Sequence, residues 1–204
     1  MTIHPEPRKM SVEEYFALES DPSTKYEYRD GYAVAMSGTS LNHVRITRNI
    51  SHEFTKRMQE GPCQAYSSDV RVIIPTRGNY LLPDIAVSCD PRDENEDQAL
   101  HFPRLIIEVL SPSTQDDDRS EKFQEYQTLP SLQEYVLVSA RYQFVEIYRR
   151  QSDETWLYQT YKPDQIVEFK CLNIQLTFAE IYKNVEVPAK FDLVKELQEK
   201  YTIY

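Results

Sequence analysis

Apolar residues recur along part of the chain with a helical period. Between residues 41 and 58 they return every four positions, which places them on one face of an amphipathic helix. Gly61-Pro62 marks the end of that helix. The positions that form the apolar stripe are Ile46, Ile50, Phe54 and Met58. A shorter helix is expected over 11–19, because Ser11 and Glu14 have the spacing of a capping box.

Other segments have the alternating or continuous apolar pattern of β-strands. Residues 25–28 and 32–36 flank Asp30-Gly31, a dipeptide that favours a two-residue hairpin turn. Residues 103–110 form the most hydrophobic segment and are expected as a central strand buried on both faces. Pro83 lacks a backbone N–H and predicts an edge or a bulge in a strand over 80–87. The other expected strands are 69–75, 134–138, 144–148, 156–161 and 166–169.

The order of these elements predicts an α/β fold with a mixed central sheet. A helix is expected over about 115–128, with Ser113 or Thr114 as its N-cap, and further helical segments over 178–182 and 190–200. Because the helices interrupt the strands irregularly, we expect helices on the faces of one sheet and no regular βαβ repeat. The expected organisation is a single domain over 1–204, with a core at about 25–150, an N-terminal hairpin extension and peripheral segments at 11–19 and 177–204.

Composition excludes several other classes of protein. With only 4 glycines, the chain contains no G-x-G-x-x-G or G-x-x-x-x-G-K phosphate loop. Cys63, Cys89 and Cys171 form no C-x-x-C pair, so a zinc knuckle is not expected. We expect these cysteines to be unpaired in a reducing cytoplasm. The sequence has no apolar signal segment at its start and no run of 18 apolar residues, so a cytoplasmic protein without a membrane span is expected.

The acidic charge is concentrated in one stretch of the chain. The net charge is −10, which by itself opposes nucleic-acid binding. Ten acidic and two basic residues lie between Asp84 and Asp118, so this stretch carries a charge of −8. Residues 90–97 suit a solvated acidic loop. Alternatively, the two ends of the stretch frame a site for a cation.

Asp84 and Glu108 each interrupt an apolar strand. A buried carboxylate is costly unless it is paired or bound to a metal, and two of them on neighbouring strands repel each other, which raises the pKa of one. A hard divalent cation, Mg²⁺ or Mn²⁺, would resolve this conflict, and the backbone carbonyl of Val109 is a further potential ligand. The alternative is that each acid pairs with an arginine or lysine.

Lys122 follows on the expected helix over 115–128. Arg119, Lys122 and Tyr126 have the spacing of one helical face, which could look back at the two carboxylates. Lys122 would then orient a water molecule or neutralise charge on a phosphate. The alternative is a surface array of Lys122 with Asp118 and Glu125. The run Asp116-Asp117-Asp118 is explained by the dipole at the start of a helix and predicts no ligand set.

Two residues nearer the start of the chain are weaker candidates for the same site. His43 lies at the inner edge of the apolar stripe, where it is either a hydrogen-bonded core histidine or a partner of the site. Glu27 alternates with two tyrosines in the first strand of the hairpin and faces away from them. The four histidines lack H-E-x-x-H spacing, so a zinc hydrolase is not expected.

Several of these residues stand in motifs that resemble a known family. The chain contains Pro83-Asp84-Ile-Ala-Val, Glu108-Val-Leu-Ser-Pro-Ser-Thr114 and Asp118-Arg-Ser-Glu-Lys122-Phe-Gln-Glu-Tyr126, followed by Glu134-Tyr-Val-Leu-Val. This pattern resembles the Uma-two family, a bacterial group of restriction-endonuclease-like proteins in the PD-(D/E)XK nuclease superfamily. The resemblance extends upstream through Lys25–Gly31 and Gly38–His43 and covers about residues 11–182.

The resemblance implies a restriction-endonuclease-like fold and metal-dependent cleavage of DNA phosphodiester bonds. Asp84 and Glu108 match the metal ligands, and Glu27 and His43 match family positions. The usual lysine of the superfamily would fall at Leu110, so Lys122 is the candidate for a lysine that has moved to the helix. Because of that departure and the charge of −10, the alternative is a weak or inactive nuclease-fold module that binds nucleic acid or a partner. A homodimer is also expected, since cutting two strands favours two-fold symmetry.

Overall fold

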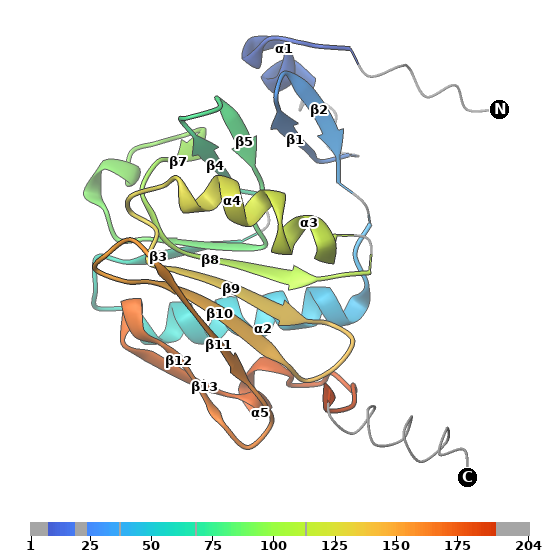
Figure 1. Ribbon diagram of the computed structural model, residues 1–204, viewed down its shortest axis with the longest axis vertical. Helices are drawn as coiled ribbons and strands as arrows, with labels where there is room; N and C mark the ends of the chain where they lie inside the picture. Colours follow the sequence, from blue (N-terminus) through green and yellow to red (C-terminus); the bar gives the residue numbers. More distant parts are fainter. Residues whose placement is uncertain (1–7, 19–23, 37, 68, 113, 191–204) are drawn as a thin grey trace, which may run out of the picture.

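The elements form layers around one main sheet. The computed structural model of the chain describes residues 8–18, 24–36, 38–67, 69–112 and 114–190. The main sheet has the strand order β11-β10-β9-β8-β6-β3 (Figure 1). A second sheet has the order β2-β1-β5-β4-β7, and β12 pairs with β13 in a small sheet.

The helices and strands have the following bounds. The helices are α1 (Val12–Leu18), α2 (Leu41–Arg57), α3 (Gln115–Arg119), α4 (Glu121–Gln127) and α5 (Phe178–Ile181), with 3-10 turns η1 (Pro91–Asp93) and η2 (Lys170–Leu172). The strands of the main sheet are β3 (Gln64–Ser67), β6 (Ile85–Ser88), β8 (Pro103–Leu110), β9 (Glu134–Ser139), β10 (Val145–Arg150) and β11 (Trp156–Tyr161). The remaining strands are β1 (Tyr26–Arg29), β2 (Tyr32–Ala35), β4 (Arg71–Ile74), β5 (Asn79–Leu81), β7 (Ala99–Leu100), β12 (Ile166–Phe169) and β13 (Ile174–Thr177).

The main sheet confirms the predicted mixed α/β architecture. β8 pairs in parallel with β9 and antiparallel with β6, whereas β9 and β10 pair antiparallel. β8 therefore lies in the interior of the sheet, as its apolar sequence predicted, and only Arg104 within it is partly exposed. The expected hairpin is also present, with Asp30 and Gly31 at positive φ in its turn.

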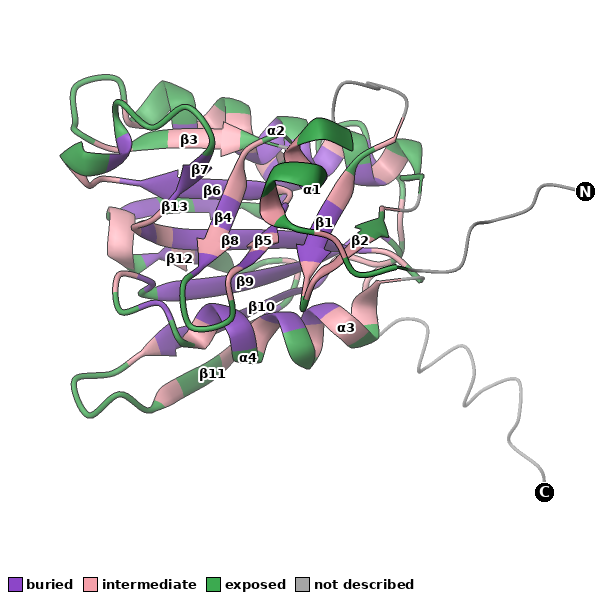
Figure 2. Cartoon of the chain, turned by 90° about the horizontal axis from the view of Figure 1, so that it is seen from above, coloured by how far each residue is buried: buried purple, intermediate pink, exposed green. Residues whose placement is uncertain are grey.

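Both faces of the main sheet are covered. On one face, Ile107 and Val109 of β8 belong to the same apolar cluster as Ile46 and Phe54 of α2. The strand residues that alternate with these point to the opposite face, where they pack against α4 and the second sheet. Figure 2 shows α2 and α4 on opposite sides of β8 and β9. Glu108 shares the face that α4 covers, because it alternates with Ile107 and Val109.

The expected strand over 80–87 is two strands in two sheets. β5 pairs with β1 and β4 in the second sheet, whereas β6 pairs with β3 and β8 in the main sheet. The break falls at Leu82-Pro83-Asp84, where proline offers no ladder donor. The expectation of a single strand is therefore wrong, although Pro83 correctly predicted an irregularity at this place.

The expected helix over 115–128 is also divided. It consists of α3 and α4, which are separated at Ser120, a residue with φ −119° and ψ −89°. The Ser120 hydroxyl donates a hydrogen bond of 2.5 Å to the carbonyl of Asp116, and such back-bonding by serine competes with the helical pattern. Thr114 precedes α3 without a side-chain cap hydrogen bond, and Ser113 lies outside the described residues.

The core extends further along the chain than the expected 25–150. β12 does not extend the main sheet as predicted but pairs with β13. Phe169 of β12 meets Phe54 of α2 with ring centroids 4.9 Å apart. Phe178 and Ile181 of α5 are buried in the same cluster, so this part of the segment expected to be peripheral belongs to the core. Of the expected helix over 190–200, residues 191–200 lie outside the described residues.

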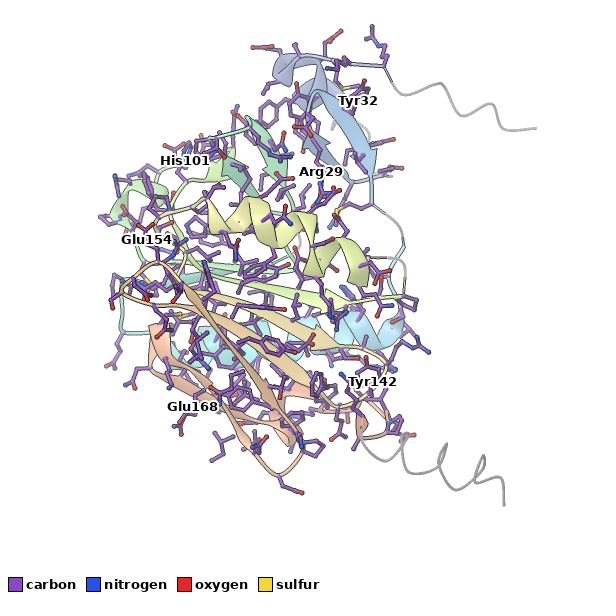
Figure 3. All side chains as sticks on the ribbon, in the orientation of Figure 1. Arg29, Tyr32, His101, Tyr142, Glu154 and Glu168 are labelled. Carbon is purple, nitrogen blue, oxygen red and sulfur yellow. A yellow bond between two sulfur atoms is a disulfide. The ribbon has the colours of Figure 1, made fainter. Side chains whose placement is uncertain are left out.

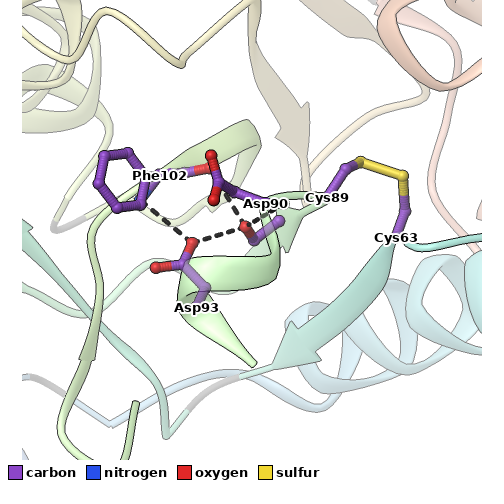
Figure 4. Close-up of a disulfide and its surroundings, with 6 residues drawn as sticks. Cys63, Cys89, Asp90, Asp93 and Phe102 are labelled. Atoms are coloured by element: carbon purple, nitrogen blue, oxygen red, sulfur yellow. Dashed lines mark hydrogen bonds between the residues drawn. A yellow bond between two sulfur atoms is a disulfide. The ribbon is translucent and has the colours of Figure 1, made fainter. Parts of the chain in front are cut away.

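The expectation that all three cysteines are unpaired is wrong. Cys63 and Cys89 form a disulfide (Figure 4), and Cys171 is free. The β3–β6 register pairs Gln64 with Ser88, so the next antiparallel position places Cys63 opposite Cys89, with their Cα atoms 3.9 Å apart. Strand β3 was not predicted from the sequence, and without it this proximity could not be anticipated.

The acidic loop after β6 is mostly exposed, as one of the two interpretations predicted. Asp93 is its exception, since it is buried beside the disulfide and accepts hydrogen bonds from the Ser88 hydroxyl and the Phe102 amide. In the described parts of the chain, no helix is both long and apolar enough to cross a bilayer.

We predict that Phe54→Ala destabilises the protein by about 3–5 kcal/mol, because it removes a fully buried ring that joins α2 to β12. Leu41→Ala in the same helix is the matched control. Leu41 is 72% exposed, so its truncation should change stability by no more than about 0.5 kcal/mol. Urea unfolding measures both variants, and equal losses would contradict the place of β12 in the core.

Candidate functional site

Asp84 and Glu108 face each other across the β6–β8 ladder. Ile85 pairs with Ile107, so the preceding antiparallel position brings Asp84 opposite Glu108. Asp84 Oδ2 accepts a hydrogen bond of 2.7 Å from the Val109 amide, and Glu108 Oε2 accepts one of 3.3 Å from the Asp84 amide. Because the strand is interrupted at Pro83, Asp84 lies just before β6 begins, directly opposite Glu108 of β8.

Both carboxylates line a cavity of about 290 Å³. Its walls come from the hairpin β1–β2, the start of α2, the end of β8 and the α3–α4 segment, so it lies where these elements meet. The ionisable residues in its lining are Glu27, Arg29, His43, Asp84, Glu108, Asp117, Asp118 and Lys122.

Lys122 occupies the centre of this cluster. It is 5% exposed, and its Nζ lies 3.0 Å from Glu27 Oε1 and 3.1 Å from Glu108 Oε1. Asp118 Oδ1 lies 3.5 Å from the same nitrogen, one helical turn earlier in the chain. Burial alone would lower the pKa of Lys122, but the charges of these carboxylates outweigh burial and raise the pKa. Lys122 is therefore a buried ammonium ion and not part of a surface array.

Glu108 is the most strongly perturbed acid of the cluster. Burial raises its pKa well above the ordinary value, against the opposing charge of Lys122. The neighbouring carboxylates of Asp118, Asp84 and Glu27 add to this rise. The sequence predicted that one of two opposed acids would have a raised pKa, and Glu108 is that acid. Lys122 at 3.1 Å is the counter-charge that favours its ionised form.

Glu27 fixes the hairpin to this cluster. Its carboxylate accepts a hydrogen bond of 3.0 Å from the Leu82 amide and forms an ion pair with Arg29 at 3.1 Å. Arg29 continues the network to Asp117 of α3 at 2.9 Å. Figure 3 shows Arg29 between the hairpin and the α3–α4 segment. Glu27 thus connects the hairpin to the break before Asp84, besides contacting Lys122.

His43 contacts the second carboxylate of the pair. The Ser40 side chain caps α2 by accepting a hydrogen bond from the His43 amide. The first turn of the helix thus lies beside the strand break. His43 Nε2 lies 3.0 Å from Asp84 Oδ2. His43 is 7% exposed, yet it lines the cavity. It is therefore a partner of the site, which was one of its two predicted alternatives.

The donor set around Asp84 and Glu108 fits a hard divalent cation. Among the described residues, the contacts of the Asp84 carboxylate are made by Oδ2. Glu108 Oε2 accepts only the long hydrogen bond from the Asp84 amide. Asp84 Oδ1 and Glu108 Oε2 are therefore the oxygen atoms that could act as metal ligands. Within the described chain, no group of at least three His, Cys, Asp or Glu side chains forms a complete metal site. A cation that keeps several waters, as Mg²⁺ does, suits two carboxylates.

The structure brings most of the predicted site residues together, but not all. Asp84, Glu108, Lys122, Glu27 and His43 line one cavity. Tyr126 reaches Glu108 Oε1 only at 3.5 Å. Arg119 does not line the cavity, because the break at Ser120 turns it toward Glu146 of β10, which it meets at 2.7 Å. A ligand role for the Val109 carbonyl stays a prediction.

Sequence reasoning missed three members of the cluster. Asp118 is 2% exposed and its Oδ1 has no hydrogen-bond partner among the described residues, although the acidic run was explained by the helix dipole alone. Its i,i+4 spacing to Lys122 was the available signal. Arg29 and Asp117 gave no comparable signal, because their ion pair joins segments far apart in the sequence.

Comparisons with known proteins find a matching family, similar sequences and a shared fold. Residues 12–179 match the family model Uma2, described as "Putative restriction endonuclease". Two uncharacterized proteins of Synechocystis sp. are similar: slr1290 is 37% identical over 87% of this chain and 93% of its own, and sll1609 is 33% identical over 72% and 85%. The crystal structure of a protein from Anabaena variabilis, described as a putative nuclease belonging to DUF820, superposes with a TM-score of 0.71. At 19% identity, it covers 87% of this chain and 99% of its own, which shows a shared fold.

We predict that Lys122→Met destabilises the protein by about 3–5 kcal/mol, because it leaves buried carboxylates without their cation. The loss should shrink as pH falls. Burial already raises the pKa of Glu108, so this carboxyl takes up a proton at acidic pH and then needs no counter-charge.

The matched control is Lys170→Met, because Lys170 is exposed and lies 3.9 Å from Glu168. Its replacement should change the free energy of unfolding by no more than about 0.5 kcal/mol. Urea unfolding at neutral and acidic pH measures both variants. A loss at Lys122 that matches the control, or that does not depend on pH, would contradict the buried ion cluster.

Proposed function

Because this chain belongs to the Uma2 family, we propose that it is a metal-dependent endonuclease that hydrolyses phosphodiester bonds of DNA. The observation that carries the proposal is the opposed pair Asp84 and Glu108, which line one cavity with a buried lysine between neighbouring acids. Two carboxylates and a lysine at one strand end have the chemistry that water-mediated phosphodiester cleavage requires.

In this proposal Asp84 and Glu108 hold a divalent cation, Mg²⁺ or Mn²⁺. When bound, such a cation lowers the pKa of a coordinated water and polarises a phosphate oxygen. The protein's own part is to orient both ligands. His43 and the Val109 amide hold Asp84 Oδ2, which leaves Oδ1 as the ligand oxygen in this proposal. Such outer contacts orient the ligands of metal sites.

Lys122 takes the place of the lysine that is absent at Leu110. Leu110 is 4% exposed and belongs to the apolar cluster beneath α4, so a lysine at that position would have to be buried among apolar side chains. Lys122 reaches Glu108 from α4 instead, at 3.1 Å. We assign it two roles: its charge opposes the rise that burial causes in the pKa of Glu108, and it stabilises negative charge that develops on the phosphate.

The same lysine also supports a second candidate function. Its contact with Glu108 Oε1 already compensates part of the acidic charge without any metal. A chain of net charge −10 that needs no cation would be a nuclease-fold module that binds nucleic acid or a protein partner without cleaving it. The measurements below separate this module from the enzyme.

We predict that the purified protein nicks supercoiled DNA in the presence of Mg²⁺ or Mn²⁺. Asp84→Asn should lower the rate at least about 100-fold, because the amide keeps the shape of the side chain but loses the ligand charge. Gel separation of nicked from supercoiled plasmid measures the rate. The matched control is Asp153→Asn, a change of the same kind in an exposed turn. Equal rates for the wild type and Asp84→Asn would contradict the proposal.

We predict that calorimetric titration with Mn²⁺ shows binding to the wild type. Glu108→Gln should weaken this binding by about 10–100-fold, since it removes a charged ligand while keeping a polar contact to Lys122. Glu121→Gln, an exposed change at the start of α4, should leave the affinity unchanged. Absence of heat with the wild type, or the same isotherm for Glu108→Gln, would favour the binding module.

A further inference from the structure

A second, larger cavity continues from the carboxylate site along α2. Its volume is about 770 Å³, and it shares with the site the residues Met36, Gly38, Thr39, His43 and Asp84. From His43 it follows one exposed side of the helix through Arg48 and Ser51 to Thr55. The floor of this groove is therefore one helix, and its inner end is the Asp84 carboxylate.

The lining of the groove differs in chemistry from the rest of this acidic protein. Asp84 is its one carboxylate among the described residues, although the whole chain carries 33 acidic residues. Arg48, His52 and Lys25 are basic members of the lining, and Lys25 is paired with Asp69 at 2.6 Å. Its hydroxyl side chains are Thr24, Thr39, Thr47, Ser51, Thr55 and Ser67. Hydroxyls and basic groups are what proteins use to contact the phosphates of a nucleic acid.

Arg48 has no ion pair or hydrogen bond from its side chain to any described residue, and it is exposed. Arg57 of the same helix is instead held by Glu53 and Glu180. The hydroxyls of Thr47 and Ser51 also have no hydrogen-bond partner within the described structure, and Thr47 is 7% exposed. Threonine in a helix divides between two χ1 rotamers, so its hydroxyl can turn to an incoming acceptor. Both hydroxyl oxygens are buried as they stand, so Arg48 is the exposed donor, and Thr47 would turn its hydroxyl toward an anionic ligand.

We propose that this groove binds the sugar–phosphate backbone of a single nucleic-acid strand that leads to the bond being cleaved. The inference rests on the proposed function, because the groove ends at Asp84. A volume of 770 Å³ lies within the range of small-ligand sites, roughly 300–1,000 Å³, and so suits a short run of nucleotides from one strand. Its described lining contains no Phe, Tyr or Trp, the usual platforms for stacked bases, although His52 and Arg48 could stack on a base. We therefore expect contact mainly with phosphates.

Fluorescence anisotropy with a labelled oligothymidylate in EDTA tests this assignment, because binding is then measured without cleavage. Arg48→Ala should weaken binding about tenfold. It should also make the slope of log affinity against log salt shallower by about 0.7, the value for one phosphate contact with a single strand. Lys56→Ala is the matched control, since Lys56 is an exposed cation of α2 that does not line the groove. It should change the affinity less than twofold.

A second variant separates a ligand contact from a structural role. Thr47→Val removes an unpartnered hydroxyl of nearly the same shape, so it should weaken oligonucleotide binding severalfold while leaving Tm equal to or above that of the wild type. A purely structural residue would lower Tm together with binding. A blunt duplex of the same length should bind more weakly than the single strand. Equal affinity for the duplex would overturn the assignment to one strand.

The outcomes distinguish this inference from the proposed function. Binding that depends on Arg48, without metal-dependent nicking, would refute the nuclease and leave the groove as a strand-binding site. Nicking by a protein whose oligonucleotide affinity is the same in the wild type and Arg48→Ala would refute the groove. Equal losses in Arg48→Ala and Lys56→Ala would show a general charge effect and overturn the inference. Absence of oligonucleotide binding by the wild type at low salt would overturn it as well.

Discussion

The site depends on one buried ammonium ion among carboxylates. Lys122 contacts Glu27 of the hairpin, Glu108 of the main sheet and Asp118 of α3, so one charge connects three separate parts of the chain. Each of these acids would be costly to bury alone. The lysine would also be costly, and burial by itself would lower its pKa. The groups are therefore stable only together, and the cavity forms where these segments meet.

The break between β5 and β6 gives this cluster its place in the fold. A single strand through residues 79–88 would keep Asp84 within a ladder, yet the chain leaves the second sheet at Leu82 and enters the main sheet at Ile85. At that break the Glu27 carboxylate accepts a hydrogen bond from the Leu82 amide, a backbone donor that neither sheet uses. The same interruption thus supplies a carboxylate ligand, an anchor for the hairpin and an open end to the main sheet.

Periodicity predicted those features that depend on neighbours in the sequence. The stripe of α2, the Asp30-Gly31 turn and the burial of β8 follow from local pattern, and the isolated acids Asp84 and Glu108 stood out against apolar strands. The features that were missed depend on contacts between distant segments. Strand β3 is short and only partly buried, so the Cys63–Cys89 pair had no local signal. Arg119 was assigned to the site because the helix was taken as continuous, and the turn at Ser120 redirects it.

The packing of α2 also sets the position of the groove relative to the Asp84 carboxylate. One side of this helix is held by Ile46, Ile50 and Phe54 against the main sheet, while its other side forms the floor of the groove and its first turn carries His43. The groove floor and the contact to Asp84 are thus parts of one rigid rod and cannot shift independently. A strand bound in the proposed groove would therefore lie at a set distance from the carboxylates of the site.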